Sequence, residues 1–367
     1  MFNFLLYPQI HLKDSEMADN MRHVPKDSMM HGEDGTGLAS SSNQTDDLED
    51  VKGIFTQLKI SPSEPDPAAS KGFTFSEVNC WRPASSRKLV CCNFSSDGRI
   101  LASAGHENKA VVWNMDTFQT HNLPEEHAYL ITDVCFRPNS TQMATSAFDK
   151  TIKLWNARDT RFSHHTFSGH KYPIVSLDIH PKKTDLLCSC DRNGEIRYWN
   201  VTQLTYLGAM KSDFGQDGPL VRFQPSTGQL LAATTGNVVS IFDVDTHTKK
   251  YTLQGHNISV QWLCWDNSGE YLASVSEDQV KVWSVSSGEC THEVSSNGNA
   301  FYSCVFHPSY TNLLVIGGYQ SLELWDMVNN QIMMVQAHEG IIAALAQSPV
   351  TGMVASASHD KSVKLWK

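Results

Sequence analysis

The chain has 367 residues, of which 40% are hydrophobic, and its formal net charge at pH 7 is −10. Because a protein that binds nucleic acid by its own surface normally carries a basic face, we do not expect direct DNA or RNA binding. No stretch approaches the ~20 consecutive apolar residues of a membrane-spanning helix, and the short apolar start lacks the basic residues of a signal peptide. The nine cysteines include no CxxC pair, which favours reduced thiols over a disulfide framework.

Residues 1–70 are expected to form a disordered acidic tail. They hold five Lys and Arg against twelve Asp and Glu, and they are rich in Ser, Asn, Pro and Met. Charge of this density is difficult to bury in a core. The apolar residues of 48–58 recur at a spacing of three to four, which is compatible with a short transient helix.

From residue 71 onward the sequence repeats with a period of about 42 residues. Each repeat contains a strand of small residues such as LASAG (101–105), and a strand of alternating character such as TIKLW (151–155). The aromatic residues that end the seven repeats are Trp113, Trp155, Trp199, Phe242, Trp283, Trp325 and Trp366. Alternation with a period of two, regular turns and this repeat length predict the four-stranded blades of a β-propeller.

Three dipeptides in the repeats resemble the WD40 signature, namely Gly169–His170, Gly255–His256 and Trp325–Asp326. We therefore predict that residues 71–367 form one all-β domain, a seven-bladed WD40 β-propeller. The last repeat ends after its third strand, and an unassigned strand precedes the first repeat at residues 72–80. We expect this strand to complete blade seven and close the ring, because an unpaired edge would otherwise remain.

Four repeats contain residues that form a hydrogen-bonded chain within WD40 blades: a His, a Ser or Thr, an acid in a turn, and the Trp. Repeat three has Asn193 where the acid is expected, and repeats one, four and six depart further. The expected members are His127, Thr145, Asp149 and Trp155; His170, Ser189 and Trp199; His256, Ser274, Asp278 and Trp283; and His338, Ser356, Asp360 and Trp366. Blades without a complete set are expected to be less rigid.

The same residues do not predict catalysis. A catalytic Ser must be exposed beside a base and an oxyanion hole, whereas these Ser residues lie in the middle of strands in several repeats. Cys188, Cys190 and His180 supply three zinc ligands where a structural site needs four. No nucleotide-binding, zinc-protease or hydrolase motif is present. We expect no enzyme activity, no cofactor and no metal site.

Long strings in the repeats resemble the carboxy-terminal propeller of the LEUNIG family of plant Groucho/Tup-type transcriptional corepressors. They are KGFTFSEVNC (71–80), ASAGHENKAVVWNMDT (102–117), LITDVCFRPNSTQMATSAFDKTIKLWN (130–156), HPSYTNLLVIGGYQSLELWDM (307–327) and SPVTGMVASASHDKSVKLWK (348–367). The resemblance implies a nuclear scaffold that docks transcription factors or other corepressor-complex proteins and does not bind DNA. The family's glutamine-rich stretch and adaptor-binding LUFS domain have no counterpart here, so adaptor binding does not carry over.

In WD40 repeats the partner-binding positions lie on one rim, shortly after the His and just before the turn acid. Carried over to this chain, they are Leu130, Phe148, Val175, Arg192, Glu277, Tyr302, Tyr319, Ile341 and His359. The apolar members are expected to form a patch with a polar margin, as at the core of an interface. Phe148 is the expected hot spot, because hot spots are few, large and often aromatic.

A second function remains open from the residues alone. Trp155, Asn156, Ala157 and Arg158 resemble the WDxR box by which many propellers bind an adaptor of cullin-type ubiquitin ligases. Asn156 stands where that box has Asp. The alternative prediction is a substrate receptor of such a ligase.

Overall fold

The computed structural model describes residues 74–82, 87–124, 126–211 and 219–367. These residues all belong to one compact unit of the chain. They form strands and turns without any helix, and so without any helix able to cross a membrane. The all-β prediction is therefore confirmed, while the tail predicted for residues 1–70 and the short helix within it lie outside the described residues.

Twenty of the strands form five separate four-stranded blades, in which each strand pairs with the next one along the chain. Blade one contains β2 (Leu89–Phe94), β3 (Ile100–Gly105), β4 (Val111–Asn114) and β5 (Thr120–Asn122). Blade two contains β6 (Ile131–Phe136), β7 (Gln142–Ala147), β8 (Ile152–Asn156) and β9 (His165–Phe167), and blade three contains β10 (Ile174–Ile179), β11 (Leu186–Asp191), β12 (Glu195–Asn200) and β13 (Thr205–Lys211). Blade four contains β14 (Val221–Phe223), β15 (Leu230–Thr235), β16 (Val238–Asp243) and β17 (Lys249–Gln254), and blade five contains β18 (Val260–Trp265), β19 (Tyr271–Ser276), β20 (Gln279–Ser284) and β21 (Cys290–Ser295).

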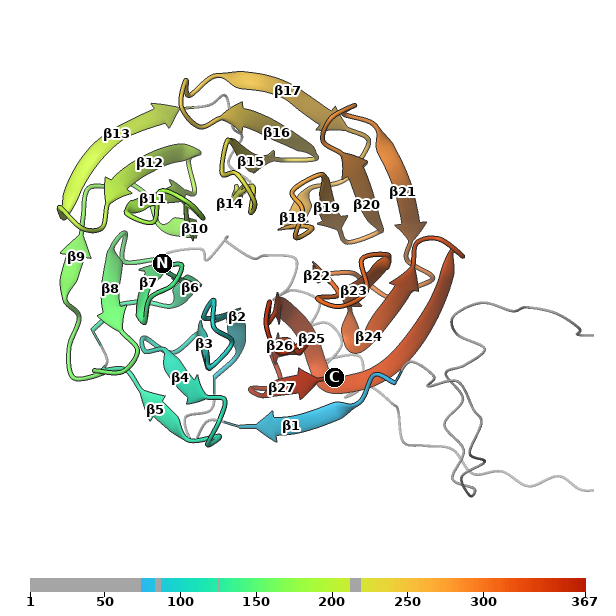
Figure 1. The fold of residues 1–367 in the computed structure, drawn as a ribbon, viewed down its shortest axis with the longest axis horizontal. Helices are drawn as coiled ribbons and strands as arrows, with labels where there is room; N and C mark the ends of the chain where they lie inside the picture. The colour runs from blue at the N-terminus through green and yellow to red at the C-terminus, as the bar shows by residue number, and fades with distance from the viewer. Residues whose placement is uncertain (1–73, 83–86, 125, 212–218) are drawn as a thin grey trace, which may run out of the picture. The chain divides into compact units, whose positions relative to one another are not determined.

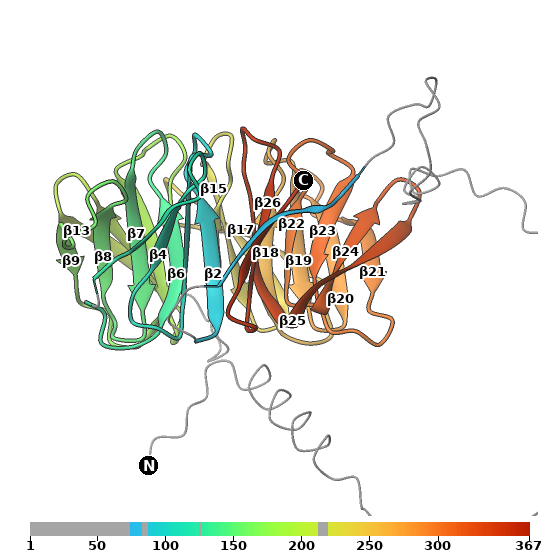
Figure 2. The same cartoon turned by 90° about the horizontal axis from the view of Figure 1, so that it is seen from below.

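The remaining strands form one seven-stranded sheet. In spatial order they are β1 (Glu77–Trp81), β27 (Val363–Trp366), β26 (Val354–Ser358), β25 (Gln331–Gln347), β24 (Tyr319–Asp326), β23 (Leu313–Gly317) and β22 (Ser303–Phe306). The sheets stand around a common centre (Figure 1), and their strands run between the two faces of the ring (Figure 2).

The prediction of seven blades is wrong, because the structure has five blades and this larger sheet. The reason is β25, which continues for 17 residues without a break. Its first part pairs with β24 and its last part with β26, and the pair Tyr319–Ile341 lies between the two parts. The residues of the last two sequence repeats therefore share one sheet.

The first and last strands of the described chain pair with each other. β1 runs antiparallel to β27, with Glu77 opposite Trp366 and Trp81 opposite Val363, and the two strands lie side by side in Figure 1. Just before β1, the Phe75 ring stacks on Trp366 with centroids 5.8 Å apart. β1 therefore forms the outer edge of the seven-stranded sheet, where both backbone and aromatic contacts hold it.

Hydrogen bonds between inner strands join neighbouring sheets. Asn93 Oδ1 on β2 accepts from the Phe136 amide on β6 at 3.2 Å, and Asp178 Oδ2 on β10 accepts from the Phe223 amide on β14 at 2.7 Å. Trp265 Nε1 on β18 donates to the Arg222 carbonyl at 3.1 Å. Apolar side chains fill the space between sheets, so the core is a series of layers around the centre rather than a single cluster.

Candidate functional site

A hydrogen-bonded chain fixes one rim of blade two. His127 Nε2 lies 2.8 Å from Thr145 Oγ1, which also accepts from Trp155 Nε1 at 2.8 Å. His127 Nδ1 lies 2.8 Å from Asp149 Oδ2. Partial burial raises the pKa of Asp149, but hydrogen bonds from His127 and Thr151 outweigh it and bring the pKa to about 2. The chain thus ties the loop before β6 to the turn between β7 and β8.

The seven-stranded sheet contains the same arrangement. His338 Nε2 lies 2.7 Å from Ser356 Oγ, and Trp366 Nε1 donates to that hydroxyl at 2.9 Å. His338 Nδ1 lies 2.9 Å from Asp360 Oδ2, which also accepts from the amide of Glu339. Burial raises the pKa of Asp360, but the bonds from His338 and Ser362 outweigh it and hold the pKa far below its usual value.

Blade three completes its chain with a residue that the sequence pattern did not identify. His170 Nδ1 lies 3.1 Å from Asp191 Oδ2, and Ser189 bridges His170 Nε2 and Trp199 Nε1. Asp191 is only 1% exposed and lies two residues before Asn193, where the acid was expected. The repeat therefore keeps its carboxylate, but takes it from the end of β11 instead of the turn.

Blade five inserts a hydroxyl between its His and its acid. His256 Nε2 lies 2.7 Å from Ser274 Oγ, which also accepts from Trp283 Nε1. His256 Nδ1 lies 2.8 Å from Ser276 Oγ, and Ser276 donates to Asp278 at 2.7 Å. Ser276 therefore lies between His256 and Asp278 in the hydrogen-bonded chain of this blade. Because Ser276 donates to Asp278, it accepts from His256 Nδ1. Burial favours the neutral imidazole, so Nε2 then accepts from Ser274.

This arrangement predicts a pH dependence. Burial, reinforced by Lys281, lowers the pKa of His256 to about 4. As the pH falls below about 6.5, His256 becomes protonated in the unfolded state, while it stays neutral in the folded state until about pH 4. The stability contribution of His256 is therefore lost between about pH 6.5 and pH 4. From about pH 7.5 to pH 5, the wild-type chain should lose about 1–2 kcal/mol more unfolding free energy than a His256→Gln variant.

Urea titrations of the two proteins at both pH values would measure this difference. Other titrating groups are common to both chains and cancel in the comparison. Parallel pH profiles for wild type and variant would show that His256 is charged in the folded state.

The rim itself is built by a repeated backbone contact. The Phe148 amide donates to the Leu130 carbonyl at 3.1 Å, so the loop before β6 meets the turn after β7. The same contact joins Arg192 to the Pro173 carbonyl and His359 to the Ile341 carbonyl. The structure therefore brings together positions that lie about 18 residues apart in each repeat.

Burial divides the nine predicted rim residues into two groups. The half-buried group is Leu130, Phe148, Arg192, Glu277 and Tyr319. The buried group is Val175, Tyr302, Ile341 and His359, at 3%, 5%, 1% and 8% exposure. Val175 and Ile341 lie inside strands, not in loops. Three of the expected apolar members, Val175, Tyr302 and Ile341, thus have little exposed surface.

Exposed apolar side chains are found instead at positions outside the nine predicted rim residues. The residue two positions after the His of the hydrogen-bonded chain is large and apolar in blades two, three and five. These residues are Tyr129, Tyr172 and Ile258, which are 62%, 48% and 39% exposed. The recurrence of a large apolar residue after three such histidines was the signal available in the sequence. With Leu130 and Phe148, these three residues define what we call the aromatic rim.

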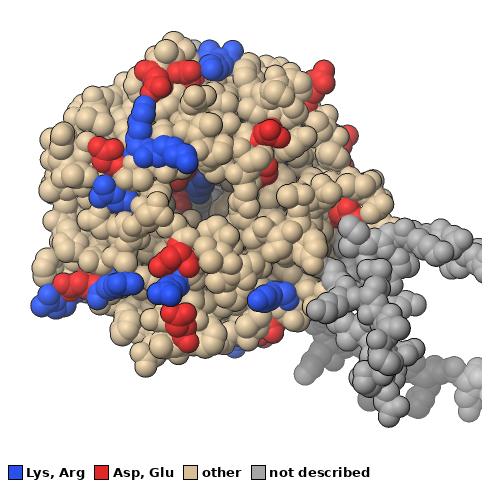
Figure 3. Space-filling view, viewed as in Figure 1, with Lys and Arg blue, Asp and Glu red and all other residues tan. Residues whose placement is uncertain are grey.

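Charges of both signs surround the centre of the ring. Acidic and basic side chains are interspersed on the face shown in Figure 3, and neither sign dominates that face. This face therefore lacks the uniform basic surface by which proteins normally bind a polyanion such as DNA.

A cavity of about 220 Å³ occupies the space between the inner strands, and the hollow is visible at the centre of Figure 3. Arg222 on β14 forms an ion pair with Asp133 on β6 at 2.9 Å and donates to Ser176 on β10 at 2.8 Å. Asp178 also lines the cavity, and burial raises its pKa to about 6 although Arg222 lowers it. Through the ion pair and the hydrogen bond, Arg222 links blades two, three and four, which indicates a structural role.

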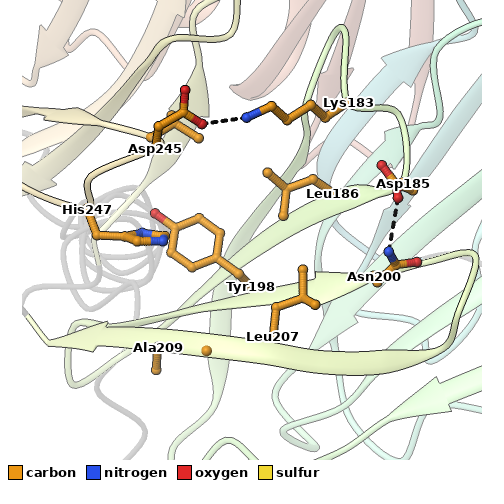
Figure 4. Close-up of a pocket in the computed structure, with 11 residues that line it drawn as sticks. Lys183, Asp185, Leu186, Tyr198, Asn200, Leu207, Ala209, Asp245 and His247 are labelled. Carbon is orange, nitrogen blue, oxygen red and sulfur yellow. Dashed lines mark hydrogen bonds and ion pairs between the residues drawn. The ribbon is translucent and has the colours of Figure 1, made fainter.

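A larger cavity of about 590 Å³ lies between blades three and four. Figure 4 shows Lys183 paired with Asp245, and Asp185 accepting from Asn200 at 2.9 Å. The His247 ring lies 4.6 Å from the ring of Tyr198. Because the charged groups that are drawn satisfy one another, the cavity presents mainly its apolar wall, which includes Leu186 and Leu207.

Among the described residues, one group of potential metal ligands is close enough to bind an ion: His170, Asp191 and Glu195, whose ligand atoms lie within 4.8 Å of one another. His170 and Asp191 already bond to each other, and Glu195 pairs with Arg197 at 3.1 Å. The hydrogen-bonded chain of blade three and the Glu195–Arg197 ion pair therefore explain why these three residues lie close together.

The cysteine–histidine set and the WDxR-like segment of the sequence both lie in simple structural contacts. Cys188 and Cys190 are fully buried on β11, while His180 Nδ1 accepts the amides of Lys182 and Lys183. In the WDxR-like segment, Asn156 Oδ1 accepts the Arg158 amide at 3.0 Å and thereby shapes the turn. Arg158 is exposed.

Comparison with known proteins identifies a similar corepressor. The chain is 52% identical over 378 residues to the transcriptional corepressor LEUNIG_HOMOLOG of Arabidopsis thaliana, covering 96% of this chain and 47% of the relative. The resemblance to the LEUNIG family is thereby confirmed. More distant relatives include the nuclear distribution protein PAC1 of Arthroderma otae, 26% identical over 74% of this chain and 66% of that protein.

Another is the pre-mRNA-processing factor 19 homolog 2 of Arabidopsis thaliana, 24% identical over 69% of this chain and 47% of that protein. The chain thus spans about half to two thirds of the length of these relatives. The WD40 family (WD domain, G-beta repeat) matches residues 77–114, 117–156, 162–200, 247–284 and 329–367. On these matches, and on the blades and hydrogen-bonded chains described above, the chain belongs to the WD40-repeat family.

Proposed function

We propose that the chain is the protein-binding part of a transcriptional corepressor, acting in the nucleus by docking transcription factors or other corepressor-complex proteins. The observation that carries the proposal is the 52% identity to a corepressor over nearly the whole chain. The chain covers less than half of that relative, so repression itself can reside in a part that has no counterpart here.

The aromatic rim is the surface that we assign to docking. Tyr129 and Tyr172 present large, exposed rings on consecutive blades, and Phe148 lies half-buried beside Leu130. Aromatic side chains contribute large contact area and dominate interface hot spots. The hydrogen-bonded chains beneath them hold the loops rigid, which lowers the entropy cost of binding.

A substitution at Phe148 tests this assignment. Phe148→Ala should weaken binding of a nuclear transcription factor retained by the wild-type chain by about 2 kcal/mol or more, because the half-buried ring anchors the rim. Thermal unfolding should show that the variant remains folded. Calorimetric titration of the purified partners measures the loss, and Arg158→Ala is the control. Loss of binding in Arg158→Ala instead would place docking at the WDxR-like segment.

A reporter experiment separates docking from repression. When the chain is fused to a heterologous DNA-binding domain, we expect weak or no repression of the reporter, because a chain that docks only onto transcription factors recruits no repression machinery. Strong repression that survives Phe148→Ala would show that the functional surface lies elsewhere on the chain.

A further inference from the structure

Two cysteines from neighbouring sheets meet at the wall of the central cavity. Cys264 on β18 and Cys304 on β22 place their sulfur atoms 3.1 Å apart. Both residues line the cavity of about 220 Å³. Cys264 is half-buried, whereas Cys304 has no exposed surface.

The backbone around the pair is held in place. Trp262 Nε1 on β18 donates to the carbonyl of Cys304 at 2.8 Å, and Gln261 Nε2 donates to the Phe301 carbonyl at 3.2 Å. These bonds fix the spacing of β18 and β22 at the level of the thiols. The sulfur atoms therefore stay in contact without any rearrangement of the sheets.

The other cysteines provide a contrast. Cys80 and Cys290 are exposed, and the Cys290 thiol donates to the His292 carbonyl. Cys188 and Cys190 are buried on a single strand, two residues apart, and Cys190 donates to the Asp191 carbonyl. Cys264 and Cys304 are thus distinguished by direct sulfur contact between two separate sheets.

We infer that Cys264 and Cys304 are a redox modification site, at which hydrogen peroxide forms a disulfide between blade five and the seven-stranded sheet. A disulfide requires the sulfur atoms to approach from 3.1 Å to about 2.05 Å. The cavity gives peroxide a route to the sulfur of Cys264.

The order of reaction follows from exposure. Burial and the neighbouring Cys264 raise the pKa of the Cys304 thiol well above its usual value, and the thiolate is the nucleophile in peroxide attack. Cys264 therefore reacts first. Its sulfur attacks one peroxide oxygen, the O–O bond breaks, and the leaving hydroxide takes up the thiol proton to form water, which leaves Cys264 as a sulfenic acid.

Cys304 completes the step. Its sulfur attacks the sulfur of Cys264, the S–O bond breaks, and the hydroxyl group leaves with the proton of Cys304 as a second water. Two thiols are oxidised by two electrons, and one peroxide is reduced to two waters. The product adds a covalent cross-link between the inner strands β18 and β22, which hydrogen bonds join in the reduced state.

The test uses the full chain with Cys80→Ser and Cys290→Ser, which removes both exposed thiols. The chain is treated with hydrogen peroxide, quenched with catalase, alkylated, and digested with trypsin without reduction. Trypsin places Cys264 in the peptide 251–281 and Cys304 in the peptide 282–361, in which Cys290 is the only other cysteine. In this background a link between the two peptides identifies the Cys264–Cys304 bond.

We expect most chains to show the linked peptides, to lose two titratable thiols, and to regain both after treatment with dithiothreitol. Adding Cys304→Ser should abolish the link and leave Cys264 oxidised to sulfinic acid. Circular dichroism of the oxidised chain should match that of the reduced one. Recovery of both thiols alkylated, or oxidation of Cys264 without a link while Cys304 is present, would overturn the inference.

Discussion

A chain that begins at residue 83 should lose most of its stability and aggregate. The deletion removes β1, which is the only partner of β27 on its outer side among the described strands, and it exposes that strand edge to other chains. It also removes Phe75, which is 6% exposed and stacks on Trp366, and Trp81, whose ring lies 5.2 Å from Trp113. Urea unfolding and light scattering measure the two effects.

Point substitutions separate packing from pairing within this segment. Phe75→Ala should cost about 3–5 kcal/mol of unfolding free energy, the range found for buried aromatic rings. Val78 lies three residues further on, within β1, and its side chain is 47% exposed, so Val78→Ala should change stability by less than about 0.5 kcal/mol. The two point variants could prove equally stable, and the truncated chain could prove as stable as the intact one. These two results together would show that β1 does not support the sheet.

Removing the charge of Arg222 should be the most damaging single substitution in the central cavity. Arg222→Ala leaves the carboxylate of Asp133, itself 7% exposed, without its partner at 2.9 Å. Stranding one member of a buried ion pair costs about 3–5 kcal/mol. The loss should appear in urea titrations at neutral pH.

A second substitution distinguishes charge from packing. Adding Asp133→Asn to Arg222→Ala leaves the same space but removes the unpaired charge, while the Asn oxygen can still accept from the Leu177 amide, so most of the lost stability should return. Arg161→Ala is the matched control, because it breaks an exposed pair with Asp159 and should have little effect. A double variant as unstable as Arg222→Ala would mean that packing, not charge, is the source of the loss.

The regular spacing of Trp113, Trp155, Trp199 and Trp366 was enough to predict an all-β propeller, because each Trp closes a strand at the same place in its repeat. Spacing could not predict the number of separate sheets. That number depends on whether the chain turns between consecutive repeats. Here β25 continues through Ala337–Ile341, and the pair Tyr319–Ile341 lies between its two paired parts.

The candidate site was less predictable for a similar reason. A pattern gives positions along the chain, but it does not give the direction of a side chain. Asp191 and Ser276 bond to the chain histidines where a residue two positions later was expected, and Val175 and Ile341 are buried. The contact between Cys264 and Cys304 joins positions in different repeats, which no local pattern relates.

The pairing of β1 with β27 also has a consequence for synthesis. Glu77 and Lys364, whose side chains form an ion pair 2.6 Å long, are 287 residues apart in the chain. A ribosome therefore releases β1 long before its partner, and each intervening blade can form from neighbouring strands while β1 waits. The closing step joins distant segments and is slow for that reason. During that interval the nascent chain exposes Phe75 and Trp81, two aromatic side chains that a chaperone could bind.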